Sequence, residues 1–260
     1  PEVGESLVNL YRRLTVEDVR YVGKVEVAEA TKVIENVQRD INIALVNELA
    51  QIFPELDLDV EDVLSAAATK WNFHRYTPGI GVGGHCIPVD PYYMMQRAQE
   101  VGVPAELITA ARAVNRMMPR HVSGVLRELL YRAGVPADDG RVLFLGWSYK
   151  AGVGDARETP ADPLADSLIE SGITVSTWDP YLSAEDIPEG IGVIEDIGDA
   201  SGFDMVVLAT AHPECKDLDW QGLLSRMRTP ILYDGRRVLD LDAMQAMGWK
   251  ANAVGSPNQY

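Results

Sequence analysis

The sequence predicts an α/β protein in which an all-helical first half precedes a doubly wound parallel sheet of the Rossmann type. In the first half, apolar residues recur every three or four positions, which is the period of an amphipathic helix. In the second half, short runs of Val, Leu and Ile alternate with helical segments, an order typical of parallel strands joined by right-handed crossovers. We therefore divide the chain into a lead-in at 1–24, a helical domain at 25–136 and an α/β domain at 137–260.

The composition is that of a globular protein with a strongly acidic surface. Of the 260 residues, 47% are hydrophobic, and 39 Asp and Glu oppose 23 Lys and Arg, for a net charge of -16. This balance argues against nucleic acid as a partner, because an acidic surface repels phosphate backbones. No apolar run approaches the roughly 18 residues of a membrane span, and we recognise no signal peptide, so we expect a cytoplasmic protein without a membrane partner. Two cysteines do not make a disulfide framework.

The longest predicted element is a helix over 25–53. Its apolar positions run from Val27 to Phe53 at three- and four-residue intervals, and Pro54 is expected to end it. At 1.5 Å per residue this helix is about 43 Å long, more than one small core can cover. We therefore expect a homodimer in which a second copy packs along the helix.

The remaining elements follow from the same two periods. Asp90 and Pro91 have the residue types of an N-cap and a first-turn proline. Pro119 is expected to separate two helices, because an interior proline removes a backbone hydrogen bond. The helices of the first half are predicted at 60–70, 90–101, 105–117 and 119–133. The second half is predicted to hold strands at 141–146, 174–178, 205–210 and 231–233 and helices at 163–171, 220–227 and 242–247.

A glycine-rich loop ending in Cys86 is the first candidate for chemistry. Glycines at 79, 81, 83 and 84 allow left-handed backbone and close approach to a neighbour. Cys86 lies just before a predicted helix, whose N-terminal dipole favours the nucleophilic thiolate. Asp90 lies four residues on, within reach to orient a water molecule or accept a proton. A lone cysteine in a glycine turn is more often an inert buried thiol, but this combination of residues favours a reactive one.

Polar residues on the long helix and in the second domain form further candidates. Lys32 and Asn36 share one helix face, and aimed at Cys86 they would form an oxyanion site, although from spacing alone a solvated pair is the simpler interpretation. Glu35 and Arg39 are expected to form a helix ion pair. Asp179 resembles the ribose-binding acid of a dinucleotide fold, but we expect a structural role, since the turn after the first strand is Gly-Trp-Ser-Tyr-Lys. His85, His212 and Cys215 lack metal-ligand spacing, and we predict no metal site.

Four segments together resemble one enzyme family. They are Glu29–Glu48, Pro78–Tyr93, Gly146–Thr159 and Tyr233–Arg237. Their types and order, over about residues 25–240, are similar to the UDP-glucose/GDP-mannose dehydrogenase family. The Thr69–Phe73 segment and the Gly-Gly-His-Cys-Ile-Pro-Val-Asp form resemble the UDP-N-acetylhexosamine branch. The resemblance implies that 25–136 is a central dimerisation domain with the catalytic cysteine, and that 137–260 binds the UDP-sugar.

The resemblance also implies a reaction. A C6 hydroxyl is oxidised twice to the uronate, with NAD as oxidant, for surface polysaccharide or glycan synthesis. Cys86 would form a thiohemiacetal and then a thioester, Lys32 and Asn36 would hold the reacting oxygen, and Asp90 would position water or accept a proton. Lys150 and the Arg236–Arg237 pair would bind phosphate, and Tyr149 would pack beside uracil or ribose. The implied substrate-binding residues are Tyr76, Gly79, Gly81, Gly83, Tyr149, Lys150, Arg236 and Arg237.

Several alternatives stay open. Arg75, Tyr76 and Ile80 are expected to form the pocket wall that selects the sugar, and Lys70 or Arg75 to reach a neighbouring subunit's site. Members of the family bind NAD on a Rossmann domain that precedes the central domain. We therefore expect no cofactor site in this chain and no activity from this chain alone. The chain would then be a truncation, a split subunit or a degenerate paralogue. A non-catalytic UDP-binding dimerisation module is the main alternative. A reactive-cysteine acyl transferase or hydrolase, with His85 as its partner, is a weaker one.

Overall fold

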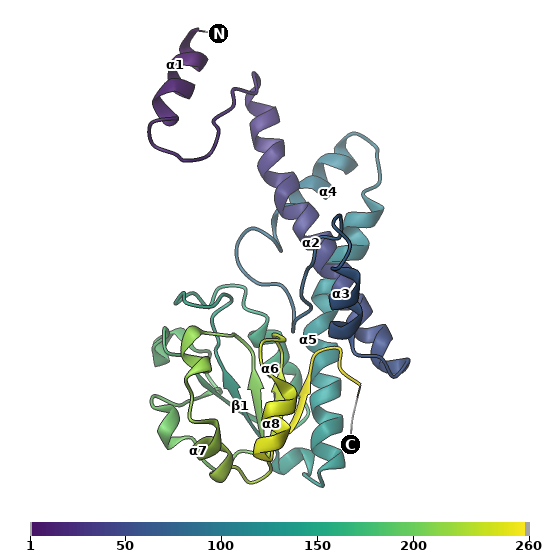
Figure 1. Ribbon diagram of the computed structural model, residues 1–260, viewed down its shortest axis with the longest axis vertical. Helices are drawn as coiled ribbons and strands as arrows, with labels where there is room; N and C mark the ends of the chain where they lie inside the picture. Colours follow the sequence, from purple (N-terminus) through teal and green to yellow (C-terminus); the bar gives the residue numbers. More distant parts are fainter. Residues whose placement is uncertain (1, 258–260) are drawn as a thin grey trace.

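The protein is described by a computed structural model that covers residues 2–257. Figure 1 shows a helical part and an α/β part, which are joined by the helix α5, Glu106–Arg132. In the helical part α5 lies beside α2, Val25–Glu55, and in the α/β part it lies against the sheet. The fold class predicted from sequence is confirmed. None of the described helices is long and apolar enough to cross a membrane.

Three predicted helices keep their place with shifted bounds. Pro54 lies in the last turn of α2 and does not end it, since a proline there removes only one backbone bond. The other two are α3, Val60–Ala67, and α4, Asp90–Glu100. No helix or strand is predicted for the lead-in at 1–24, but it contains the helix α1, Glu2–Tyr11. No residue of α1 is buried, and it lies at the end of the molecule opposite the sheet.

The predicted break at Pro119 is wrong, because α5 is one continuous helix. Pro119 is buried, and a Cβ added to Gly81 would lie 3.2 Å from the proline ring. The adjacent Met118 and the next-turn Val122 are fully buried. Burial of this apolar face outweighs the single hydrogen bond that the proline cannot donate.

The sheet has six parallel strands in the order β3-β2-β1-β4-β5-β6, the doubly wound arrangement that the sequence predicts. The strands are β1 Arg141–Leu145, β2 Thr174–Trp178, β3 Gly192–Val193, β4 Met205–Leu208, β5 Ile231–Asp234 and β6 Lys250–Ala253. Neither β3 nor β6 is expected from sequence. The first is only two residues long, and the second, Lys-Ala-Asn-Ala, lacks the β-branched and aromatic residues that mark strands.

Helices cover both faces of the sheet. Along β1 the side chains alternate, so that Val142 and Phe144 face one core and Leu143 and Leu145 the other. The first core is closed by α5 and by α6, Ala161–Ile169; the second is closed by α7, Trp220–Ser225, and α8, Leu241–Met247. This packing sets the loops at the carboxyl ends of β1 and β5 beside the glycine-rich loop of the helical part.

Candidate functional site

A cleft of about 540 Å³ lies between α2, the glycine-rich loop and the first loop of the α/β domain. Most of the predicted site residues line it, although they come from four separate stretches of sequence. The lining residues are Lys32, Asn36, Arg39, Ile43, Thr77, Pro78, Gly79, Gly81, Val82, Gly83, Gly84, His85, Cys86, Ile87, Tyr149, Lys150 and Arg236. The tertiary structure thus places the Cys86 thiol, the Asn36 amide and several lysine and arginine side chains around one cleft.

Cys86 is exposed in this cleft, one turn before α4. Its carbonyl accepts the backbone N–H groups of Val89 at 3.1 Å and Asp90 at 2.8 Å, which holds the thiol at the start of the helix. Asp90 is the first residue of α4 and not its N-cap as predicted, since Val89 occupies the cap position and no side chain caps the helix. The Asp90 carboxylate is therefore available to another partner.

That partner is Asn36, whose side-chain amide donates to Asp90 Oδ2 at 2.6 Å. Asn36 is buried, so the interpretation as a solvated surface amide is excluded. Lys32, one turn earlier, is exposed and lies 3.4 Å from Glu35 Oε2. The expected Glu35–Arg39 pair is wrong, since Glu35 pairs with Lys32 and Arg39 lines the cleft.

The glycine-rich loop packs directly on the α/β domain. A Cβ on Gly83 would lie 2.6 Å from the Glu158 carbonyl oxygen, and one on Gly84 would lie 2.7 Å from the Tyr149 ring. At Gly84 the positive φ of 91° also favours glycine. The His85 ring meets Tyr149 edge-on at 6.5 Å. Only glycine at 83 and 84 allows the loop to pack this closely on the α/β domain. This close packing brings Cys86 and the Tyr149–Lys150 turn to the same cleft.

Sequence reasoning missed a buried polar network beneath the loop. Asn47 Oδ1 accepts the Gly79 N–H at 3.0 Å, and Asn47 Nδ2 donates to Asn115 at 2.9 Å. Asn115 donates to Asp40 Oδ1 at 2.8 Å, and Arg112 forms an ion pair with the same oxygen at 2.6 Å. Burial raises the pKa of Asp40, with Arg112 opposing. The available signal was the spacing of polar residues at 36, 40 and 47, which places them on one face of the helix together with apolar positions such as Val37 and Ala44.

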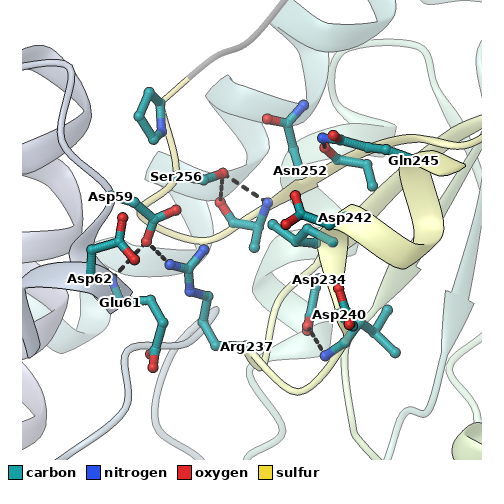
Figure 2. A pocket seen from close by; sticks show the side chains of 15 residues that line it. Asp59, Glu61, Asp62, Asp234, Arg237, Asp240, Asp242, Gln245, Asn252 and Ser256 are labelled. Carbon is teal, nitrogen blue, oxygen red and sulfur yellow. Dashed lines mark hydrogen bonds and ion pairs between the residues drawn. The ribbon is translucent and has the colours of Figure 1, made fainter. Parts of the chain in front are cut away.

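The two neighbouring arginines point into different pockets. Arg236 lines the cleft, its Nε donates to the Ala209 carbonyl, and its backbone N–H donates to Asp234 at 2.8 Å. Arg237 has left-handed backbone, with φ of 55°, and its buried guanidinium pairs with Asp59, the N-cap of α3. Figure 2 shows this pair in a separate acidic pocket. The structure therefore does not bring Arg237 to the predicted substrate site.

The predicted pocket wall is also displaced. Tyr76 packs against the core, and its hydroxyl donates to Gln38 at 3.3 Å. Arg75 forms an ion pair with Glu61 on α3, and Ile80 is fully buried. None of the three lines the cleft, although Thr77, Pro78 and Gly79 beside them do, because the three side chains are directed to α3, to Gln38 and to the core. Among residues 2–257, no cluster of three or more His, Cys, Asp or Glu side chains could hold a metal ion.

Comparison with known proteins assigns the chain to a family. Residues 26–117 match the central domain of the UDP-glucose/GDP-mannose dehydrogenase family, and residues 143–241 match its UDP-binding domain. The chain is 40% identical to the UDP-N-acetyl-D-glucosamine 6-dehydrogenase of Pseudomonas aeruginosa, over 93% of this chain and 58% of that protein. It is 35% identical to the UDP-N-acetyl-D-mannosamine dehydrogenase of Pyrococcus horikoshii, over 91% of this chain and 55% of that protein.

A solved structure agrees with these sequence matches. The UDP-D-ManNAc dehydrogenase structure from Pyrococcus horikoshii aligns with a TM-score of 0.81 and 31% identity, covering 98% of this chain and 58% of that one. The chain thus spans a little over half the length of the relatives it matches. Both matched domains, in their order, show that this chain belongs to the UDP-glucose/GDP-mannose dehydrogenase family.

Proposed function

We propose that this chain provides the substrate cleft and the cysteine nucleophile of an NAD-dependent UDP-N-acetylhexosamine 6-dehydrogenase. The observation that carries the proposal is that Cys86, Lys150 and Arg236 line one cleft. Relatives with UDP-N-acetylglucosamine and UDP-N-acetylmannosamine in their names support this class of substrate.

The cations of the cleft suit a diphosphate. Lys150, Arg236 and Arg39 supply positive charge on a chain whose net charge is -16. Burial lowers the pKa of Arg236 to about 10, with Asp234 opposing, so its guanidinium stays charged at neutral pH. A charged guanidinium that is already fixed by backbone contacts binds phosphate oxygens with little further loss of conformational freedom. Tyr149 lies beside these cations and offers a ring to the uracil or ribose.

Cys86 suits the covalent part of the reaction. Its thiolate sulfur would add to the C6 aldehyde carbon, giving a thiohemiacetal whose oxygen lies near Lys32. Loss of a hydride from that carbon leaves a thioester, and water then adds, releasing the uronate and the free thiol. Asp90, held by Asn36, would accept the proton of that water.

Both oxidations need a hydride acceptor, and NAD is the one that this family's reaction implies. The α/β domain does not fit it. The Asp179 carboxylate, which would bind a ribose, is buried and accepts the N–H groups of Trp147 and Ser148 at 2.7 and 2.8 Å. We therefore assign no NAD site to the α/β domain and derive no step from one there.

We also propose that α2 pairs with a second copy of the chain. Val27, Ile34, Leu45 and Ile52 remain exposed along this helix. Several large apolar side chains along one long helix indicate a surface that another helix covers. A non-catalytic UDP-binding module is the second candidate, and the exposed position of Cys86 in the cleft argues against it.

Titration calorimetry tests the assignment. The chain should bind UDP-N-acetylglucosamine or UDP-N-acetylmannosamine, and Lys150→Ala should weaken binding by roughly 10-fold or more, the usual cost of removing a charged partner of about 1.4 kcal/mol or more. Lys216→Ala, an exposed lysine outside the cleft, is the matched control. Absence of binding by the unaltered chain would overturn the proposed function.

A further inference from the structure

His212 is a buried histidine whose two ring nitrogens both have partners. It is 1% exposed and lies after β4, at the carboxyl edge of the sheet. The Gly152 backbone N–H donates to Nδ1 at 3.1 Å, so Nδ1 is an acceptor and carries no proton. The proton is therefore on Nε2, which donates to Asp179 Oδ2 at 3.0 Å. The neighbouring groups thus select one tautomer of the neutral ring.

Asp179, which follows β2, collects donors from the loop after β1. The oxygen that accepts from His212 also accepts from Trp147 N–H at 2.7 Å and from Ser148 N–H at 2.8 Å. The other oxygen accepts from Tyr181 N–H at 2.9 Å. The side chain is 1% exposed. Burial would raise the pKa of Asp179, but these hydrogen bonds outweigh it and hold the pKa well below its usual range.

The sheet order explains why these two residues meet. In the order β3-β2-β1-β4, β1 lies between β2 and β4, so its carboxyl-end loop is flanked by the loops of both neighbours. Asp179 holds the start of that loop at Trp147 and Ser148, and His212 holds its end at Gly152. Between the two held points lie Tyr149 and Lys150, the residues that the loop contributes to the cleft.

We propose that Asp179 and His212 are positioning residues for the UDP-sugar site: together they clamp the 147–152 loop so that Tyr149 and Lys150 meet the nucleotide diphosphate. The inference rests on the proposed function. Lys150 itself is exposed, so its direction depends on the backbone that carries it. A loop held in its bound shape loses less freedom when the ligand arrives, which improves affinity without any direct contact.

Other roles for His212 fit less well. It is buried under Tyr181, whose ring stacks on it at 4.9 Å, so neither substrate nor solvent reaches the imidazole. Within the described range 2–257, His85 is the histidine that lines the cleft, and it is exposed. The two partners of His212, the Gly152 backbone N–H and the Asp179 carboxylate, are therefore explained by a role in holding the 147–152 loop.

Amide substitutions separate the two hydrogen bonds. In His212→Gln the side-chain amide nitrogen takes the place of Nε2 and still donates to Asp179. In His212→Asn the amide oxygen takes the place of Nδ1 and still accepts from Gly152. His212→Ala keeps neither bond. By titration calorimetry with the UDP-N-acetylhexosamine, we expect the alanine variant to bind roughly 10- to 100-fold more weakly, as when a supporting partner of a site residue is lost. The two amide variants should recover part of that loss.

His121→Ala, on α5, is the matched control and should bind like the unaltered chain. Circular dichroism and thermal unfolding establish that each variant is folded at the temperature of the titration. Amide hydrogen exchange gives an independent readout, because Gly152 should be protected in the unaltered chain and in His212→Asn and should exchange rapidly in His212→Ala.

The outcomes separate the clamp from the proposed function. Unchanged affinity in a folded His212→Ala variant would overturn the positioning role. Weak binding that neither amide variant improves would assign His212 to packing alone and would equally overturn it. If the unaltered chain binds no UDP-sugar, the proposed function fails, and Gly152 exchange still decides whether His212 holds the loop.

Discussion

The Asn36 side-chain amide lies 2.6 Å from the Asp90 carboxylate and joins α2 to the first residue of α4. This contact links two residues 54 positions apart in the chain. It holds the Asp90 carboxylate at the start of α4, one helical turn after Cys86. The helix pair α2–α4 and the geometry near the thiol are therefore coupled.

Removing either partner should destabilise the protein. Asn36→Ala leaves a part-buried carboxylate without its donor, and we expect unfolding to become easier by about 1–3 kcal/mol. A double-mutant cycle with Asp90→Ala, measured by urea unfolding, should give a coupling energy of about 1–2 kcal/mol. Additive effects of the two substitutions would show that the contact contributes nothing to stability.

The two cysteines should differ sharply in alkylation. Cys86 is exposed, whereas Cys215 is buried, and burial raises the pKa of Cys215 to about 12. Iodoacetamide under native conditions should therefore add one group per chain, and mass spectrometry should find none on Cys86→Ser. A UDP-sugar should slow the reaction. A Cys86 rate no higher than that of a free cysteine at neutral pH would contradict the activated nucleophile.

Replacing each arginine of the Arg236–Arg237 pair by methionine should separate binding from stability. Arg236→Met removes a cation of the cleft, so affinity for the UDP-sugar should fall by roughly 10-fold or more. Arg237→Met breaks the buried pair with Asp59. It should lower the free energy of unfolding by about 1–3 kcal/mol and leave affinity within about twofold. Calorimetry and urea unfolding give the two quantities, and loss of binding in Arg237→Met would restore Arg237 to the substrate site.

The pH dependence of stability should include a component from His121. Burial lowers the pKa of this half-buried imidazole, with Glu55 opposing. The unfolded chain therefore takes up a proton near pH 6.5 that the folded chain does not bind, so stability falls as pH drops below about 6.5. His121→Gln should flatten this part of the curve, as measured by urea unfolding from pH 7.5 to 5. Equal slopes in both proteins would contradict this assignment.

The proposed pairing along α2 is tested by hydrodynamics. Leu45 and Ile52 are exposed on α2, and an aspartate at either position would face the apolar surface of a second copy. Light scattering should find a dimer for the unaltered chain and a monomer for Leu45→Asp. Leu107→Asp, on α5 and also exposed, is the control. A monomeric unaltered chain would refute the pairing.

By itself, the sequence determined the class of fold, the long helix, the four main strands and the segments that carry the site. These features depend on local periods and on contiguous residue patterns, which neighbouring chain segments do not alter. The continuous apolar run of β1 predicts a strand, and the three- and four-residue repeat of α2 predicts a helix. Lys32, Asn36, Cys86 and Lys150 lie within short motifs that are recognised from their order along the chain.

Only the tertiary structure decided how those residues are used. Pro119 stays inside α5 because the space beside Gly81 accepts its ring, Arg236 and Arg237 diverge because one turn residue has a left-handed backbone, and Asn36 faces Asp90 because α2 and α4 pack together. The role of Asp179 likewise depends on β2 and β4 lying on either side of β1. Each outcome comes from contacts between distant segments, which local sequence patterns do not encode.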